Sequence, residues 1–231
     1  MIEGRCVIIG LDQYLYRMPR IKGHTADEVE RVGHYLDWAN RDPKQLNISW
    51  DDWMGRYPQE KPSEALIELY KPFYVERYWL WDEDHKYPHK SIEEQVGYWR
   101  KANQIHRWFV EHVQDGEDDC QYHHECTKEV LEELLATCEK VLAGTVMTYG
   151  KVVNGYTFEN GKRVPCYEDG KVIMNPEFCN DLLPLTDGFF FGNQQYNEWY
   201  LEDIADTIKI LNEVLATTDF ETQMVFYRSS W

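Results

Sequence analysis

The residues best suited to bind a ligand lie in the stretch GYWRKANQIHRWF. If this stretch is helical, a rotation of about 100° per residue puts Trp99, Asn103 and His106 on or beside its apolar face. Arg100 and Arg107 lie just beyond them on the same side. Guanidinium groups bind phosphate or carboxylate through paired hydrogen bonds, and a tryptophan ring stacks on a nucleobase. The pattern therefore predicts a binding site for a small anionic, nucleotide-like ligand.

Two other interpretations of the same helix remain open. Asn103 and His106 could hold the helix to backbone carbonyls or to acids of the last helix, because an unpaired buried polar group costs about 1–3 kcal/mol. His106 could instead act as an acid–base group in a hydrolase. The sequence contains no recognisable Ser-His-Asp or Cys-His nucleophile context. It therefore favours a non-enzymatic binding protein over an enzyme.

The segment DDCQYHHEC combines thiols and imidazoles, which are ligands that zinc prefers. The candidate metal ligands are Cys120, His123, His124 and Cys126. Their spacing is not that of a standard zinc motif, and no Cys-x-x-Cys pair completes the set. We expect a solvated acidic loop here and no bound cofactor. Zinc, and with it a metal-assisted hydrolase, is the alternative.

The chain is strongly acidic, with 41 acids against 24 bases and a net charge of −17. Such a surface repels phosphates, so no direct nucleic-acid binding is expected. The last predicted helix carries Glu202, Asp206 and Glu213 on one face. This face is either a solvated surface or a surface that imitates nucleic acid. The second interpretation predicts an inhibitor that binds a basic host protein.

The elements that must position these residues are helices and strands that are segregated along the chain. Capping residues predict helix starts after Thr25, with Glu28 as capping-box partner, after Thr127, and at Ser91. The predicted helices are residues 26–39, 91–113, 128–143 and 196–216, with one helical turn at SWDDWMG. The predicted strands are residues 6–18, 74–81 and 220–231. Segregated elements predict an α+β fold with an antiparallel sheet packed against several helices.

Residues 151–174 differ from their surroundings, because short β-prone runs alternate with the turn signals Asn160-Gly161 and Asp169-Gly170. They predict a three-stranded β-meander inserted into a single domain that spans residues 1–231. The sequence has no apolar run of about 18 residues and no signal-peptide pattern, so we expect a cytoplasmic protein without a membrane partner.

The stretch GYWRKANQIHRWF followed by VQDGEDDC, the block DGFFFG with EWY, the opening GLDQYLYR and the closing YRSSW resemble a family of uncharacterised phage and prophage proteins. The resemblance covers both ends and the middle of the chain, with residues 151–174 as additional material. It implies a phage-encoded accessory protein acting in the host cytoplasm. One such role is counter-defence, by capture of a host signalling nucleotide. The resemblance transfers no catalytic residues.

Overall fold

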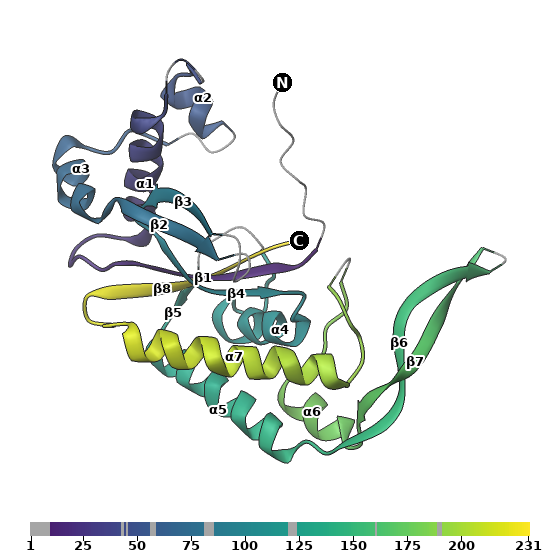
Figure 1. The fold of residues 1–231 in the computed structure, drawn as a ribbon. Helices are drawn as coiled ribbons and strands as arrows, with labels where there is room; N and C mark the ends of the chain where they lie inside the picture. The colour runs from purple at the N-terminus through teal and green to yellow at the C-terminus, as the bar shows by residue number, and fades with distance from the viewer. Residues whose placement is uncertain are drawn as a thin grey trace. The chain divides into compact units, whose positions relative to one another are not determined.

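The computed structural model describes residues 10–42, 44, 46–55, 59–80, 86–119, 124–159, 161–188 and 191–231. The described chain has an α+β fold with antiparallel sheets, as the sequence predicts (Figure 1). The helices are α1 (Ala26–Asn40), α2 (Trp50–Met54), α3 (Glu64–Tyr70), α4 (Asn103–Val113), α5 (Lys128–Gly144), α6 (Pro176–Leu182) and α7 (Glu198–Thr217), with a 3₁₀ turn at Lys71–Phe73. No described helix is long and apolar enough to cross a membrane.

The described strands form one four-stranded and two two-stranded sheets. They are β1 (Asp12–Pro19), β2 (Val75–Leu80), β3 (Lys86–Ser91), β4 (Glu94–Arg100), β5 (His124–Cys126), β6 (Met147–Glu159), β7 (Lys162–Ile173) and β8 (Gln223–Ser230). The four-stranded sheet has the order β4-β1-β8-β5, and the other sheets are the pairs β2-β3 and β6-β7.

The described chain divides into two compact units, each with its own core. Unit 1 comprises residues 10–14, 98–217 and 227–231, and unit 2 comprises residues 15–97 and 218–226. The boundaries fall inside β1, β4 and β8, so each of these strands contributes residues to both units.

The core of unit 2 forms around α1. Thr25 and Glu28 make the predicted capping box at the start of this helix. The helix buries apolar residues three to four positions apart, as expected for an amphipathic helix. The core contains Met18, Val29, Val32, Leu36, Leu66, Tyr70, Ile92, Met224 and Phe226.

In unit 1, α5 lies along α7 (Figure 1). The helix α5 begins after its predicted cap, Thr127, whose side chain accepts a hydrogen bond from the Val130 amide. Each helix buries one apolar stripe, because its apolar residues recur at helical spacing. The buried residues are Leu131, Leu134, Cys138 and Val141 in α5, and Tyr200, Ile204, Thr207, Leu211 and Val214 in α7.

The helix predicted over residues 91–113 is wrong in its first half. The chain forms strand β4 up to Arg100, and helix α4 begins at Asn103. Burial alternates along β4, with Gln95, Gly97 and Trp99 inside, because this segment pairs as a strand in the four-stranded sheet. Lys101, at φ 65°, turns the chain from the strand into the helix.

The three-stranded meander predicted over residues 151–174 is also wrong. Strands β6 and β7 form one antiparallel hairpin, in which Gly150 pairs with Gly170 and Lys151 pairs with Asp169. Gly170 is not in a turn. A Cβ atom there would lie 2.7 Å from Cγ2 of Val152, so this glycine allows a close side-chain approach within the hairpin.

Candidate functional site

The structure places Asn103 inside unit 1, where its side-chain atoms bind the backbone of a neighbouring segment. Its Nδ2 donates to the carbonyls of Phe191, at 3.1 Å, and Asn193, at 2.9 Å. Its Oδ1 accepts from the Thr186 amide at 3.0 Å. The residue is 1% exposed. These contacts support the structural interpretation of Asn103, in which the start of α4 is held to the backbone of Thr186, Phe191 and Asn193.

His106 lies in a buried chain of polar groups. Its Nδ1 is 2.8 Å from the Tyr227 hydroxyl, which donates to Oε1 of Gln13 at 3.0 Å. The Gln13 amide nitrogen donates to the Ala102 carbonyl at 3.0 Å, so its oxygen can only accept. The Tyr227 hydroxyl oxygen therefore accepts a hydrogen bond from the N–H at Nδ1 of His106. The other ring nitrogen lies 2.9 Å from Oδ2 of Asp118, within hydrogen-bonding distance.

This chain of polar groups is buried from Gln13 to His106 and reaches the surface at Asp118, which is exposed. Gln13 and Tyr227 are fully buried, and His106 is 1% exposed. Burial raises the pKa of the Tyr227 hydroxyl well above its usual value, so that this group keeps its proton. His106 thus orders the interior of unit 1 through two satisfied contacts.

The three remaining candidates of the predicted ligand site have different environments. Trp99 is 4% exposed, and its indole nitrogen donates to Oγ1 of Thr207 at 2.9 Å. Arg107 lies on the surface, with Nε 2.7 Å from a carboxylate oxygen of Glu111. Arg100 is exposed at the end of β4. Ligand binding at this group of residues stays a prediction, with the two arginines as its accessible members.

The acids predicted on the last helix lie on the exposed side of α7, at Glu202, Asp206 and Glu213. Asp203 lies between the first two and is largely buried. Burial raises its pKa to about 7, and the charges of Asp206 and Glu202 add to the effect. The Gln104 amide donates to Asp203 at 3.0 Å and partly offsets it.

Of the candidate zinc ligands, Cys120 and His123 lie outside the described residues. His124 is 2.8 Å from a carboxylate oxygen of Asp119, and Cys126 is a buried free thiol whose pKa is raised by burial. Within the described ranges, no group of three or more His, Cys, Asp or Glu residues is arranged to hold a metal ion.

Unit 2 contains a cavity that no sequence motif indicated. It encloses about 240 Å³. Its charged walls are Arg17, Arg20, Arg77 and Glu94; we call it the arginine cavity. The remaining walls are Met18, Pro19, Ile21, Phe73, Thr222 and Gln223.

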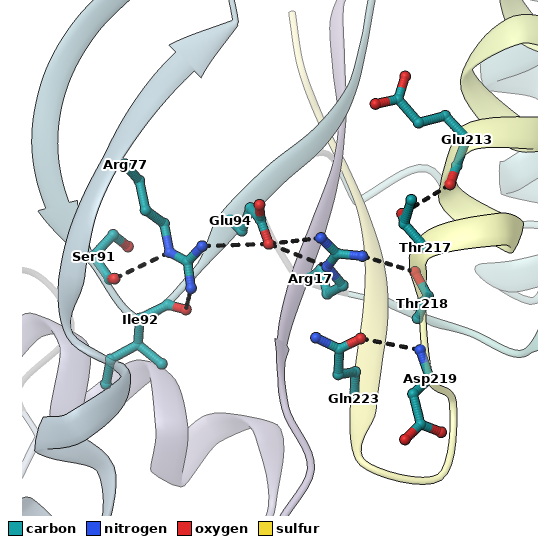
Figure 2. A network of polar contacts seen from close by, with 10 residues as sticks. All are labelled: Arg17, Arg77, Ser91, Ile92, Glu94, Glu213, Thr217, Thr218, Asp219 and Gln223. Atoms are coloured by element: carbon teal, nitrogen blue, oxygen red, sulfur yellow. Dashed lines mark hydrogen bonds and ion pairs between the residues drawn. The ribbon is translucent and has the colours of Figure 1, made fainter.

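The carboxylate of Glu94 lies between two of the three guanidinium groups, those of Arg17 and Arg77 (Figure 2). Its Oε2 accepts from Nη2 of Arg17 at 2.8 Å and from Nε of the same residue at 3.1 Å. The same oxygen lies 3.3 Å from Nη1 of Arg77. One carboxylate oxygen thus fixes the positions of two positive charges that belong to β1 and β2.

Backbone and hydroxyl acceptors hold the other sides of these arginines. Nε of Arg77 donates to the Ser91 carbonyl at 3.2 Å, and its Nη2 donates to the Ile92 carbonyl at 3.4 Å. Nη1 of Arg17 donates to Oγ1 of Thr218 at 3.3 Å. Each terminal nitrogen of Arg77 carries two hydrogens, and these contacts use one hydrogen on each nitrogen. The second hydrogen on each nitrogen takes no part in these contacts.

Positive side chains predominate among the described walls of the arginine cavity. These walls include three guanidiniums and one carboxylate, in a chain whose net charge is −17. The side chains of Arg17 and Arg77 are only 13% and 20% exposed, so water screens their charges less than it would on an open surface. The cavity is therefore suited to attract and hold an anion.

No protein-family model, curated protein or solved structure matches this chain.

Proposed function

We propose that this protein binds a small anionic molecule without turnover and that the arginine cavity is where the anion binds. The observation that carries the proposal is the convergence of Arg17, Arg20 and Arg77 on one partly enclosed space, where Glu94 is the one acid among the described wall residues. This proposal keeps the predicted class of function, capture of an anion. It assigns the binding site to unit 2 instead of to the residues around α4 in unit 1.

The volume of the cavity limits the size of the bound group. At about 240 Å³ it has the volume of about eight water molecules, each of which occupies about 30 Å³ in the liquid. Sites for drug-sized ligands have volumes of about 300–1,000 Å³. A phosphate group or a small carboxylic acid fits the cavity. A nucleotide would place its phosphate there and its base outside.

The arginines are held in place before any anion arrives. Glu94, Thr218 and the carbonyls of residues 91 and 92 fix the guanidiniums of Arg17 and Arg77. Side chains that are already ordered lose little entropy on binding, which favours affinity. Ile21 and Phe73 add apolar walls against which the carbon part of a ligand can pack.

The walls of the cavity support binding more than catalysis. Among the described wall residues there is no histidine, cysteine or lysine. Glu94 accepts from the Arg17 guanidinium and lies 3.3 Å from that of Arg77, so its carboxylate is already engaged by two positive groups. The hydroxyl of Thr222 donates to Asp219 at 2.8 Å.

Calorimetric titration with inorganic phosphate, pyrophosphate and a nucleoside monophosphate tests the proposal. Arg77→Ala removes a charged hydrogen-bond donor, which is worth about 1.5–3 kcal/mol, so affinity should fall about tenfold to a hundredfold. Arg100→Ala, at an exposed arginine of unit 1, is the matched control and should leave affinity unchanged. If none of the three anions binds, the proposal is wrong.

The exposed acids Glu202, Asp206 and Glu213 support a second candidate function, inhibition of a basic host protein by an acidic surface. Such a complex should weaken as salt is added, because rim charges are screened. Reversal of these three charges should abolish it, and a complex that survives the reversal would exclude this function. In either case, the predicted use is counter-defence by a phage-encoded protein in the host cytoplasm.

A further inference from the structure

The hairpin of β6 and β7, residues 147–173, forms a long two-stranded arm of unit 1; we call it the β arm (Figure 1). Four aromatic side chains on it are largely exposed to solvent. They are Tyr149 at 86%, Tyr156 at 47%, Phe158 at 78% and Tyr167 at 63%. Large exposed apolar surfaces on soluble proteins mark interaction sites.

The strand register puts all four rings on one face of the β arm. Side chains of paired residues project to the same side, and so do those of every second residue. Tyr149, Tyr156 and Phe158 pair with residues 171, 165 and 163 of β7. Residues 171, 165 and 163 lie an even number of positions from Tyr167 along β7, so all four rings project to the same side. The irregularity between Val153 and Tyr156 adds one residue to β6 and keeps this phase.

The opposite face of the β arm is covered at its base. Val152 projects to that face and is 1% exposed. A Cβ atom on Gly170 would lie 3.3 Å from Oε1 of Glu198, the first residue of α7. The amide of Val153 also donates to Oε1 of Gln195 at 3.1 Å. The base of the arm is therefore anchored to unit 1, with its aromatic face turned to solvent.

Charge distinguishes the β arm from the rest of the chain. Residues 147–173 contain four bases and three acids, a net charge of +1. Since the whole chain carries −17, the remaining residues carry −18. Two copies of this chain therefore repel each other over most of their surfaces. The β arm is nearly neutral, so two arms can meet without that penalty.

We propose that the aromatic face of the β arm binds the same face of a second copy, which gives a symmetric dimer. Such an isologous contact is the commonest interface of soluble homo-oligomers. An aromatic side chain buries about 150–250 Å², so the exposed parts of eight rings supply about 1,000 Å². This is about the area that a specific interface needs. The dimer is independent of anion binding in unit 2.

Sedimentation velocity of the full chain over a range of concentrations tests the dimer. Phe158→Glu puts a charge into the centre of the interface and should raise the dimer dissociation constant at least tenfold. Thr157→Glu is the matched control, because Thr157 is exposed on the same strand and projects to the opposite face. It should leave the dissociation constant within about threefold of that of the original chain, since an exposed charge outside an interface changes little.

Two results would overturn the proposal. One is a wild-type chain that stays monomeric up to about 100 µM, a concentration at which a specific interface of this size is populated. The other is a dimer whose dissociation constant responds equally to Phe158→Glu and Thr157→Glu, which would place the contact elsewhere on the molecule. Circular dichroism of both variants checks that the hairpin and helices are retained.

Discussion

The buried carboxyl of Asp203 should make the stability of unit 1 depend on pH in an unusual direction. Burial, together with the charges of Asp206 and Glu202, raises its pKa from 3.8 to about 7. The folded protein therefore holds this proton more tightly than the unfolded chain does. Below about pH 4 both states are protonated and the group contributes no penalty. As pH rises to about 7, the free energy of unfolding falls, and above that pH the whole penalty is present.

The pKa difference sets the size of the effect. A change from 3.8 to about 7 corresponds to about 4 kcal/mol, which is an upper limit because Asp203 keeps some contact with water. Asp203→Asn keeps the shape of the side chain and an oxygen that can accept from Gln104, and it removes the charge. The variant should be more stable than the original chain at about pH 8, by up to about 4 kcal/mol, and equally stable near pH 4.

Urea unfolding of both proteins at several pH values between about 4 and 8 measures this difference. Asp206→Asn is the control, since Asp206 is an exposed neighbour on the same helix and its removal should change stability by less than about 1 kcal/mol. A stability difference between Asp203→Asn and the original chain that does not change with pH would refute the reasoning. So would a variant that is less stable at high pH.

Three further changes test the packing of unit 1. Asn103→Ala leaves two carbonyls and one amide without their buried partner. It should lower the free energy of unfolding, measured in urea, by about 3–6 kcal/mol. A loss below about 1 kcal/mol would contradict the structural role of Asn103. Gly192→Ala should lower the free energy of unfolding by about 1–3 kcal/mol. The reason is that Gly192 has φ 95° and that a Cβ atom there would lie 2.9 Å from the Lys101 carbonyl oxygen. Unchanged stability would contradict this strain. Burial raises the pKa of the Cys138 thiol to about 12. Mass spectrometry should therefore find Cys138 alkylated by a maleimide only after the protein is unfolded. Rapid modification of the folded protein would argue against its burial.

Local signals in the sequence predicted the helices well, because caps act over a few residues. Thr25 with Glu28, and Thr127, lie at the helix starts where the sequence places them. The stretch from Ser91 to Val113 shows where such signals fail. Its polar and apolar residues fit a helix, but pairing of β4 in the four-stranded sheet decides the conformation of residues 94–100. Pairing with a distant strand leaves no mark on local spacing.

The arginine cavity could not be predicted for the same reason. Arg17 and Glu94 are 77 residues apart, and their contact depends on how β1 and β4 lie in one sheet. Arg77 joins them from β2. By contrast, the exposed acids of α7 and the buried position of Asn103 follow from periodicity within one helix. A binding site built from residues of one helix can be found by spacing, and one built across strands requires the tertiary structure.

The most direct test of the anion site compares two pairs of arginines with one probe, pyrophosphate, by calorimetric titration of the full chain. Arg20→Ala with Arg77→Ala removes two positive charges from the cavity, and Arg100→Ala with Arg107→Ala removes two from the surface of unit 1. We predict that the first double variant loses at least about a hundredfold in affinity for pyrophosphate, since each charged hydrogen bond is worth about 1.5–3 kcal/mol. The second double variant should bind pyrophosphate as the original chain does. Loss of binding in the second double variant and not in the first would contradict the account and would place the anion beside α4.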